Sequence, residues 1–462
     1  MKTILQFSIL IFFTSIFAQS NSSLSTKTIN DITNFIKEKK EYYNSPNIAV
    51  AITDNNKTIY LKHFGNSQKE NKYLIGSNAK SFTALITLIL QEKGLLNINE
   101  PVNKYLKWFK YKNKNISNKI TIKNLLQHTS GISTEMGETF LESDKNFDYT
   151  KYYSEILRKI EINDLSEQSY RYSNVNYRLL GLIIENVTNK KFNECLNFYI
   201  TKPMRLNDTS ADINTDLIDS YQYFLYKPIL KFNKSFHSQE TPSGLISSTA
   251  NDMAIYLRNL MNSYNSNSNT VLNTNTTKQL FTSNQNNKSG YGFGWRIFND
   301  LFYHSGTNKS FESSMYILPS INKAIIVLIN SNQAPDSEII NGIASILLNQ
   351  KFNKTSSFPY YRSLPLVVFI ILIIFLFQIR KWMKLKFPIN LSRKIIPNLL
   401  LITGISLTSY FLFLFPKLNG VSLKTAIQFD PTSSYSIILI VLLIILTFLL
   451  TYFNKNTKII KI

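Results

Sequence analysis

Ser77 and Lys80 have the side-chain types and the spacing that nucleophilic acyl transfer requires. The run from Ser81 to Leu90 is mostly apolar and lacks Gly and Pro, so it predicts a buried helix beginning close to Ser77. Ser77 then lies among unpaired amides at the positive end of the helix dipole, and Lys80 projects from the same face one turn later. Because a serine nucleophile needs a group that takes its proton, the pair predicts a lysine-assisted serine site.

Ser-x-x-Lys alone is a weak motif in a chain that is rich in both residues. The segment Ser320–Lys323 also matches, but it lies between two apolar, strand-like runs, where a turn is expected. In isolation, Ser77 is more typical of a helix N-cap and Lys80 of a solvated side chain. The motif gains meaning only from the elements around it.

Strand patterns occur at both ends of the region that contains this pair. An amphipathic helix is predicted over Ser25–Tyr43, a long, mostly helical region ends near Asn287, and a final helix lies near Ser337–Leu348. The predicted strands are Asn47–Thr53, Thr58–Phe64, Leu301–His304, Ser313–Leu318 and Ala324–Asn330. Strands from both ends of a domain usually pair in one sheet, so we expect an α+β fold: an antiparallel sheet flanked by helices, a mostly helical lobe, and the site in the cleft between them.

Hydrophobic residues make up 44% of the 462 residues and are unevenly placed. Residues 1–18 have the pattern of a signal peptide, residues 19–354 form the predicted domain, and residues 355–363 form a tether. Residues 364–462 contain three apolar runs with near-spanning lengths, which predict three transmembrane helices: Leu364–Ile379, Leu399–Phe415 and Ile437–Phe453. The first link, Arg380–Lys394, is densely basic and is therefore expected inside the cell. This places the domain outside the cytoplasm, on a multi-pass protein of the cell membrane.

Several other classes of function are disfavoured by composition. The net charge of +22 comes from lysines scattered among asparagines, without a basic stripe, so no nucleic-acid partner is expected. Cys195 is the only cysteine and cannot form an intramolecular disulfide. The four histidines show no metal-ligand spacing, so neither a metal nor another cofactor is expected.

Three short motifs follow one another along the predicted domain: Ser77-Asn78-Ala79-Lys80, Tyr172-Ser173-Asn174 and His304-Ser305-Gly306. In this order they resemble the serine beta-lactamase and penicillin-binding protein superfamily, and within it the class C beta-lactamase-like serine hydrolases. Each triplet also recurs by chance, so the resemblance depends on order and on similar flanking stretches. These are Leu125–Ile132, Tyr177–Glu185, Pro203–Ser210, Ser243–Ser248 and Tyr291–Trp295. The segment Thr307–Phe311 departs from the family because it lacks the second glycine usual before the phenylalanine.

The resemblance implies a role for each motif residue. Ser77 would attack a carbonyl and become acylated, and Lys80 would take part in proton transfer. Tyr172, if cationic neighbours lower the pKa of its phenol, would accept the serine proton and later deliver it to the leaving group. Asn174 would position Lys80 and the substrate.

The third motif would supply the other wall of the site. His304 and Gly306 would lie on the cleft strand, where the glycine lets substrate approach the backbone. The amides of Ser77 and Thr307 would form the oxyanion hole. His304 stands where many relatives carry lysine, so any help that it gives as a cation would depend on pH. His128 is assigned to structure.

The sequence thus predicts a membrane-anchored serine hydrolase that cleaves an amide or ester bond outside the cytoplasm. The resemblance includes D-alanyl peptidases, penicillin-binding proteins and beta-lactamases, so the expected partners are a small peptide, ester or beta-lactam substrate and the membrane. Two alternatives stay open: a sensor that a ligand acylates, and an esterase of the same fold.

Overall fold

The computed structural model describes residues 23–351, apart from short internal gaps, and five isolated residues near the C-terminus. The gaps are residues 139–147, 163–168, 213–215, 225–226, 232–237, 266–272, 284–289 and 333–335, and the isolated residues are Ser434, Tyr435, Ile438, Leu439 and Leu442. The predicted signal peptide (1–18) and tether (355–363) lie outside the described residues, as does nearly all of the predicted membrane region (364–462). Within the described part of the chain, no helix is both long and apolar enough to cross a membrane.

The domain is organised around an antiparallel sheet with the strand order β2-β1-β10-β9-β8-β7. The strands are β1 (Ile48–Thr53), β2 (Thr58–Phe64), β7 (Arg296–Phe298), β8 (Leu301–Thr307), β9 (Glu312–Leu318) and β10 (Lys323–Ile329). Ile48 pairs with Ile329, and Thr53 with Ala324, so the first and last strands of the domain are neighbours. The prediction that strands from the two ends share one antiparallel sheet is confirmed.

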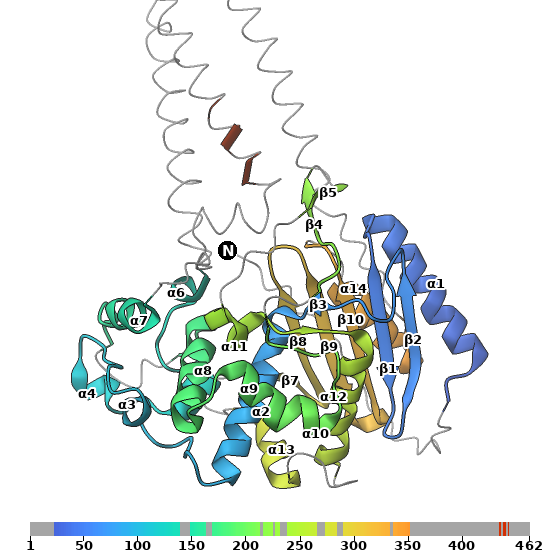
Figure 1. Ribbon diagram of the computed structural model, residues 1–462. Helices are drawn as coiled ribbons and strands as arrows, with labels where there is room; N and C mark the ends of the chain where they lie inside the picture. Colours follow the sequence, from blue (N-terminus) through green and yellow to red (C-terminus); the bar gives the residue numbers. More distant parts are fainter. Residues whose placement is uncertain are drawn as a thin grey trace, which may run out of the picture. The chain divides into compact units, whose positions relative to one another are not determined.

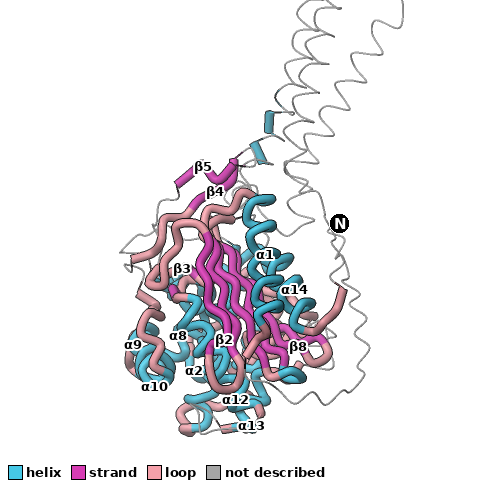
Figure 2. The backbone as a smooth tube through the Cα atoms, turned by 90° about the vertical axis from the view of Figure 1, so that its right-hand side faces the viewer, coloured by secondary structure: helices cyan, strands magenta, loops and turns pink. Residues whose placement is uncertain are grey.

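One face of the sheet is covered by α1 (Thr26–Tyr43) and α14 (Asp336–Leu347), as Figures 1 and 2 show. Every residue of β1 is buried, and its branched side chains Ile48, Val50 and Ile52 pack with residues of these two helices. Burying one such side chain contributes roughly 1.5–3 kcal/mol, so this layer fixes the register of β1.

The opposite face carries small residues where helices approach most closely. Ala49 and Ala51 alternate with the branched residues of β1 and join the larger core around α2 (Ala79–Glu92) and α12 (Ala250–Tyr264). Twelve consecutive residues of α2, Ala79–Leu90, are buried. The sequence predicted a buried helix here, and the nucleophile motif is therefore attached to the most enclosed helix of the domain.

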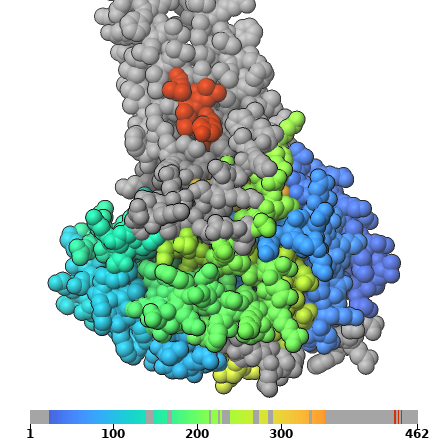
Figure 3. Space-filling view, in the orientation of Figure 1, coloured from blue at the N-terminus to red at the C-terminus, as the bar shows by residue number. Residues whose placement is uncertain are grey.

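The helical lobe between the two groups of strands is built mainly from short helices. They are α3 (Val102–Tyr105), α4 (Lys114–Ser117), α5 (Ile122–Leu126), α6 (Thr134–Glu138), α7 (Tyr149–Leu157), α8 (Asn174–Thr188), α9 (Phe192–Leu196), the π-helix η3 (Asn197–Thr201) and α10 (Lys202–Met204). Further along lie α11 (Thr241–Gly244), α13 (Thr274–Leu280) and the 3₁₀ turns η4 (Ser238–Glu240) and η6 (Pro319–Ile321), whereas the 3₁₀ turn η1 (Gly76–Asn78) precedes α2. In Figure 3, the green residues of the middle of the chain lie between the cyan residues of this lobe and the blue residues of the N-terminal strands.

Two small sheets and β7 were not predicted. β3 (Tyr73–Leu74) pairs with β6 (Ser247–Ser248), and β4 (Tyr221–Phe224) pairs with β5 (Lys227–Lys231). β3, β6 and β7 have only two or three residues and therefore show no period, so only tertiary pairing reveals them. The second Ser-x-x-Lys copy is a turn, as expected: η6 is followed by Asn322, which has a left-handed conformation (φ 49°), and Lys323 begins β10.

Candidate active site

Ser77 lies in η1, directly before α2, and Lys80 lies one turn further along. The Nζ atom of Lys80 is 3.0 Å from Ser77 Oγ, 2.7 Å from Asn174 Oδ1 and 2.6 Å from the carbonyl oxygen of Ser243. Lys80 is fully buried. The predicted pair is thus assembled, and the carbonyl of Ser243, at α11, is a third partner that no motif indicated.

The three contacts of Lys80 restrict where its hydrogens point. An amide oxygen and a backbone carbonyl can only accept, so two N–H groups of Lys80 are directed at Asn174 and Ser243. The remaining position faces Ser77 Oγ. An ammonium would donate there, whereas a neutral amine would present its lone pair to the serine hydroxyl. Burial and then the positive charge of Arg178 hold the pKa of Lys80 well below its usual value, which favours the neutral amine.

Tyr172 is close to both residues. Its phenol is hydrogen-bonded to Ser77, and its ring centroid is 5.0 Å from Lys80 Nζ. Burial raises the pKa of Tyr172, and the hydrogen bond with Ser77 offsets only part of this rise. The condition under which Tyr172 would accept the serine proton, a lowered pKa, is therefore not met. The phenol is protonated and can donate.

Asn174 is the first residue of α8, and its side chain is hydrogen-bonded to Lys80. Its Oδ1 accepts from Lys80, and its Nδ2 donates to the carbonyl oxygen of Gly137 at 3.1 Å. The expected contact with Lys80 is present.

β8 is held tightly against the nucleophile turn. Gly76 has φ +52°, and a Cβ at this position would lie 2.6–2.9 Å from Gly306 and from the nitrogen of Thr307. A Cβ on Gly306 would lie 2.0 Å from the carbonyl oxygen of Ile75. Ser313 Oγ donates to the same carbonyl oxygen at 2.8 Å. Because Gly306 has no side chain, the nucleophile turn can approach β8 closely. The family resemblance implied instead that this glycine lets substrate approach the backbone.

His304 is buried beside this turn within an aromatic cluster. Its Nδ1 lies 2.7 Å from the carbonyl oxygen of Ser305, which can only accept, so Nδ1 carries the proton and Nε2 accepts from the Tyr291 hydroxyl at 3.1 Å. Burial, followed by the charges of Arg296 and Lys80, holds the pKa of His304 well below 6.5. The neutral form of His304 is therefore favoured, so of the two roles considered for it, a cation or a hydrogen-bonding group, the geometry supports hydrogen bonding.

Arg296, on β7, is a cation at the site that the motifs did not indicate. Its guanidinium carbon lies 6.0 Å from the ring centroid of Tyr172 and 5.7 Å from that of Tyr291. It directly follows the family-like stretch Tyr291–Trp295, so its position in the sequence was the available signal.

His128 has the structural role assigned to it. It adopts a left-handed conformation (φ 57°) and is buried, and its Nδ1 accepts from the Ser173 amide at 3.1 Å. Its ring centroid is 4.5 Å from that of Tyr172. His128 therefore stabilises the second motif through its contacts with Tyr172 and Ser173.

The absence of a second glycine after the third motif, in Thr307–Phe311, has a local explanation. Asn308 Oδ1 accepts from the amides of Ser310 and Phe311 at 3.2 and 3.0 Å, and these hydrogen bonds hold the turn closed. Residues 307–311 all have negative φ, so the turn does not require glycine.

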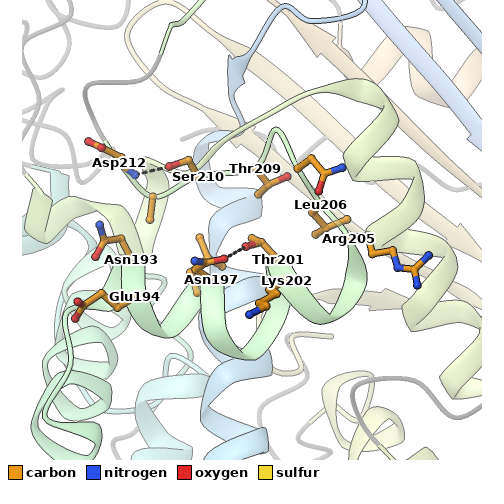
Figure 4. Close-up of a pocket in the computed structure, with 13 residues that line it drawn as sticks. Asn193, Glu194, Asn197, Thr201, Lys202, Arg205, Leu206, Thr209, Ser210 and Asp212 are labelled. Atoms are coloured by element: carbon orange, nitrogen blue, oxygen red, sulfur yellow. Dashed lines mark hydrogen bonds between the residues drawn. The ribbon is translucent and has the colours of Figure 1, made fainter.

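A separate cavity of about 480 Å³ lies between η3, α10 and the following loop (Figure 4). Its lining includes Asn197, Thr201, Lys202 and Arg205, and none of the motif residues. Among the described residues, no three His, Cys, Asp or Glu side chains gather as metal ligands.

A lysine-assisted serine before a buried helix, facing the edge of an antiparallel sheet, defines a serine acyl-transfer hydrolase with an α+β fold. The sequence profile described as Beta-lactamase matches residues 32–348. The chain therefore belongs to the beta-lactamase family, and by this membership it is a serine hydrolase.

Three relatives illustrate the similarity. Protein flp of Staphylococcus aureus (strain MRSA252) is 29% identical over 66% of this chain and 64% of its own length. The teichoic acid D-alanine hydrolase of S. aureus (strain NCTC 8325 / PS 47) is 28% identical over 60% of this chain and 64% of its own length. An octameric penicillin-binding protein homologue from Pyrococcus abyssi has the same fold, with a TM-score of 0.60, 24% identity, and coverage of 73% of this chain and 81% of that chain. The match thus spans about 64% of the length of these curated relatives.

Proposed function

We propose that this protein hydrolyses an amide or ester of a small acyl donor through an acyl-enzyme on Ser77. The observation that carries the proposal is the set of contacts around Lys80. Two of its three polar partners can only accept hydrogen bonds, and the third is Ser77 Oγ at 3.0 Å. A neutral Lys80 is thereby oriented to take the serine proton.

The reaction proceeds by two acyl transfers. Ser77 Oγ attacks the carbonyl carbon as its proton passes to Lys80, and the oxyanion is held by the amides of Ser77 and Thr307. The bond to the leaving group then breaks, and the protonated phenol of Tyr172 donates to the departing oxygen or nitrogen, with Lys80 returning a proton to Tyr172. In the second transfer, water attacks the ester carbonyl as its proton passes to Lys80. The bond to Ser77 Oγ then breaks, Lys80 returns the proton to Oγ, and the acid is released.

The substrate class proposed is a D-alanyl ester or amide of a cell-envelope polymer. One relative is named a teichoic acid D-alanine hydrolase, and the chain aligns with it over 291 residues. The predicted signal peptide and membrane region support placing the domain outside the cytoplasm. We therefore propose a membrane-anchored enzyme whose residues 19–360 face the envelope.

Intact-mass analysis of the full chain in detergent tests the proposal. After exposure to p-nitrophenyl acetate, to penicillin and to a D-Ala-D-Ala peptide, we expect a covalent adduct from at least one compound, located at Ser77 and lost in Ser77→Ala. An unchanged mass with the whole panel, in folded protein, would refute the acyl-enzyme. Stable labelling without turnover of any ester or peptide would instead identify the acylated sensor.

The location is tested separately on spheroplasts. External protease should digest the domain and spare the loop Arg380–Lys394. A protected domain would refute the proposed location without bearing on the chemistry.

A further inference from the structure

A buried ion pair lies behind the catalytic lysine. Arg178, on α8, and Glu240, at the end of η4, approach to 3.4 Å between Nη2 and Oε1, and each side chain is only 2% exposed. A pair removed from water in this way costs desolvation, so its contribution to stability alone is a weak reason for its presence. Its location suggests another role.

Ser243 connects this pair to Lys80. The carbonyl oxygen of Ser243 accepts from Lys80 Nζ at 2.6 Å, and its Oγ lies 3.4 Å from Arg178 Nε. The same Oγ donates to the carbonyl oxygen of Glu240 at 2.9 Å. One residue of α11 thus contacts the lysine on one side and both members of the ion pair on the other.

α8 brings Arg178 to Lys80 from the same face as Asn174. The two residues are four positions apart, so they are neighbours along one side of the helix. Asn174 binds the amine directly, and Arg178 places a permanent positive charge behind it. Among the described residues, no carboxylate forms an ion pair with Lys80, and Glu240 is paired with Arg178.

We propose that Arg178 is a positioning residue that keeps Lys80 in its neutral, proton-accepting form, and that Glu240 limits how strongly it does so. The inference rests on the proposed role of Lys80 as the base for Ser77. Like charges close together in a buried site disfavour each other, and Arg178 cannot lose its proton. The repulsion therefore falls on Lys80, in agreement with the contribution of Arg178 to its lowered pKa.

The other groups facing Lys80 do not titrate near neutral pH. The rings of Tyr172 and Tyr177 lie 5.0 and 5.8 Å from Nζ, and burial raises the pKa of both phenols. His128 and His304 also interact with Lys80, and burial holds the pKa of each well below 6.5. An acidic limb in the acylation rate near neutral pH therefore reports on Lys80.

The test is the pH dependence of Ser77 acylation by p-nitrophenyl acetate, followed by intact mass from pH 5 to 10 on the full chain. Arg178→Met removes the positive charge and should move the acidic limb up by about one pH unit. Glu240→Gln removes the opposing charge and should move it down. Arg178→Lys retains a cation and should leave the limb near the parent position.

The acidic limb should move up in Arg178→Met and down in Glu240→Gln, and these opposite directions distinguish an electrostatic role from a merely structural one. Loss of packing would lower the plateau in both variants or move both limbs the same way, and either result overturns the inference. Glu338→Gln is the matched control, because it breaks the remote, largely buried pair with Lys39 and should leave the limb in place. If Arg178→Met does not fold, the downward movement expected for Glu240→Gln, against none for Arg178→Lys and Glu338→Gln, still tests the inference. Failure of the parent to acylate would refute the role of Ser77 instead.

Discussion

Burial determines what each side chain of this site can do. Lys80, Tyr172 and His304 could all carry or transfer a proton, but burial displaces each toward its neutral form. The neutral lysine is an acceptor, and the neutral phenol is a donor. The neutral histidine can only hold its neighbours, through Ser305 and Tyr291. At the scale of residues, burial thus supports the proposed roles of Lys80 as base and Tyr172 as acid, and a role of His304 in hydrogen bonding.

Tyr172→Phe tests this assignment for the phenol. The ring packs 4.5 Å from His128 and should remain in place, so folding should survive. Loss of the donor should lower kcat by about 10² to 10⁴, the usual range for a general acid. With Lys80 as the proposed base, the acidic limb of the pH–rate profile should keep its position. Parent-rate turnover, or disappearance of that limb, would contradict the assignment.

His304→Asn and His304→Lys test the neutral histidine. His304→Asn should leave every limb of the profile from pH 5 to 9 in place, because the pKa of His304 lies well below 6.5. His304→Lys would bury an ammonium near Arg296 and Lys80, so we expect thermal unfolding at a lower temperature and no gain of activity at high pH. A limb near pH 6.5 that vanishes in His304→Asn would show that the histidine works as a cation.

At the scale of elements, the contact between the nucleophile turn and β8 forms the catalytic geometry. Gly76 and Gly306 allow two backbones to meet, and Ser313 on β9 bonds to the carbonyl oxygen of Ile75 on the turn. The amides of Ser77 and Thr307 belong to these two segments. Their relative position is thus set by a backbone contact that any added carbon atom would disturb.

Gly306→Ala should damage catalysis through this contact. Its Cβ would lie 2.0 Å from the Ile75 carbonyl oxygen and 2.6 Å from Ser313 Oγ, so the turn must move away from β8. A displacement of about 1 Å is enough for a loss of about 10² in acylation rate. Gly94→Ala is the control, because its Cβ would meet nothing within 4 Å. It should lose about 1 kcal/mol of stability, owing to its positive φ, and keep the parent rate. Equal acylation by both variants would contradict the argument.

At the scale of the whole molecule, the sequence predicted the sheet and located the motif residues, because both leave local patterns. Strand-like runs marked β8, β9 and β10, and the order of three motifs marked Ser77, Lys80 and Tyr172. Charge states could not be predicted in the same way, since the burial of His304 comes from residues far apart in the chain. Arg178 follows Asn174 by one helical turn, but its importance depends on Ser243 and Glu240, which only folding brings to it.

The pH dependence of global stability provides a final test, at Asp336. This residue begins α14, and its Oδ2 accepts from Ser314 Oγ on β9 at 2.5 Å. Burial raises the pKa of Asp336 from 3.8 to about 6. The folded state therefore binds this proton more tightly than the unfolded state, so the stabilisation is complete below pH 3.8 and is lost as pH rises through about 6.

Asp336→Asn removes this titration and keeps an oxygen for Ser314. Relative to the variant, the parent should lose about 2 to 3 kcal/mol of unfolding free energy as pH rises across that window. His128 and His304 act with the opposite sign, because below pH 6.5 the unfolded chain takes up protons that the folded histidines refuse. Both proteins contain these histidines, so their contribution cancels in the difference. Denaturant unfolding of parent and variant at a series of pH values measures this difference in unfolding free energy. A difference that stays constant from pH 4.5 to 7.5 would show that Asp336 is already ionised in the folded protein, with Ser314 and the start of α14 stabilising its charge.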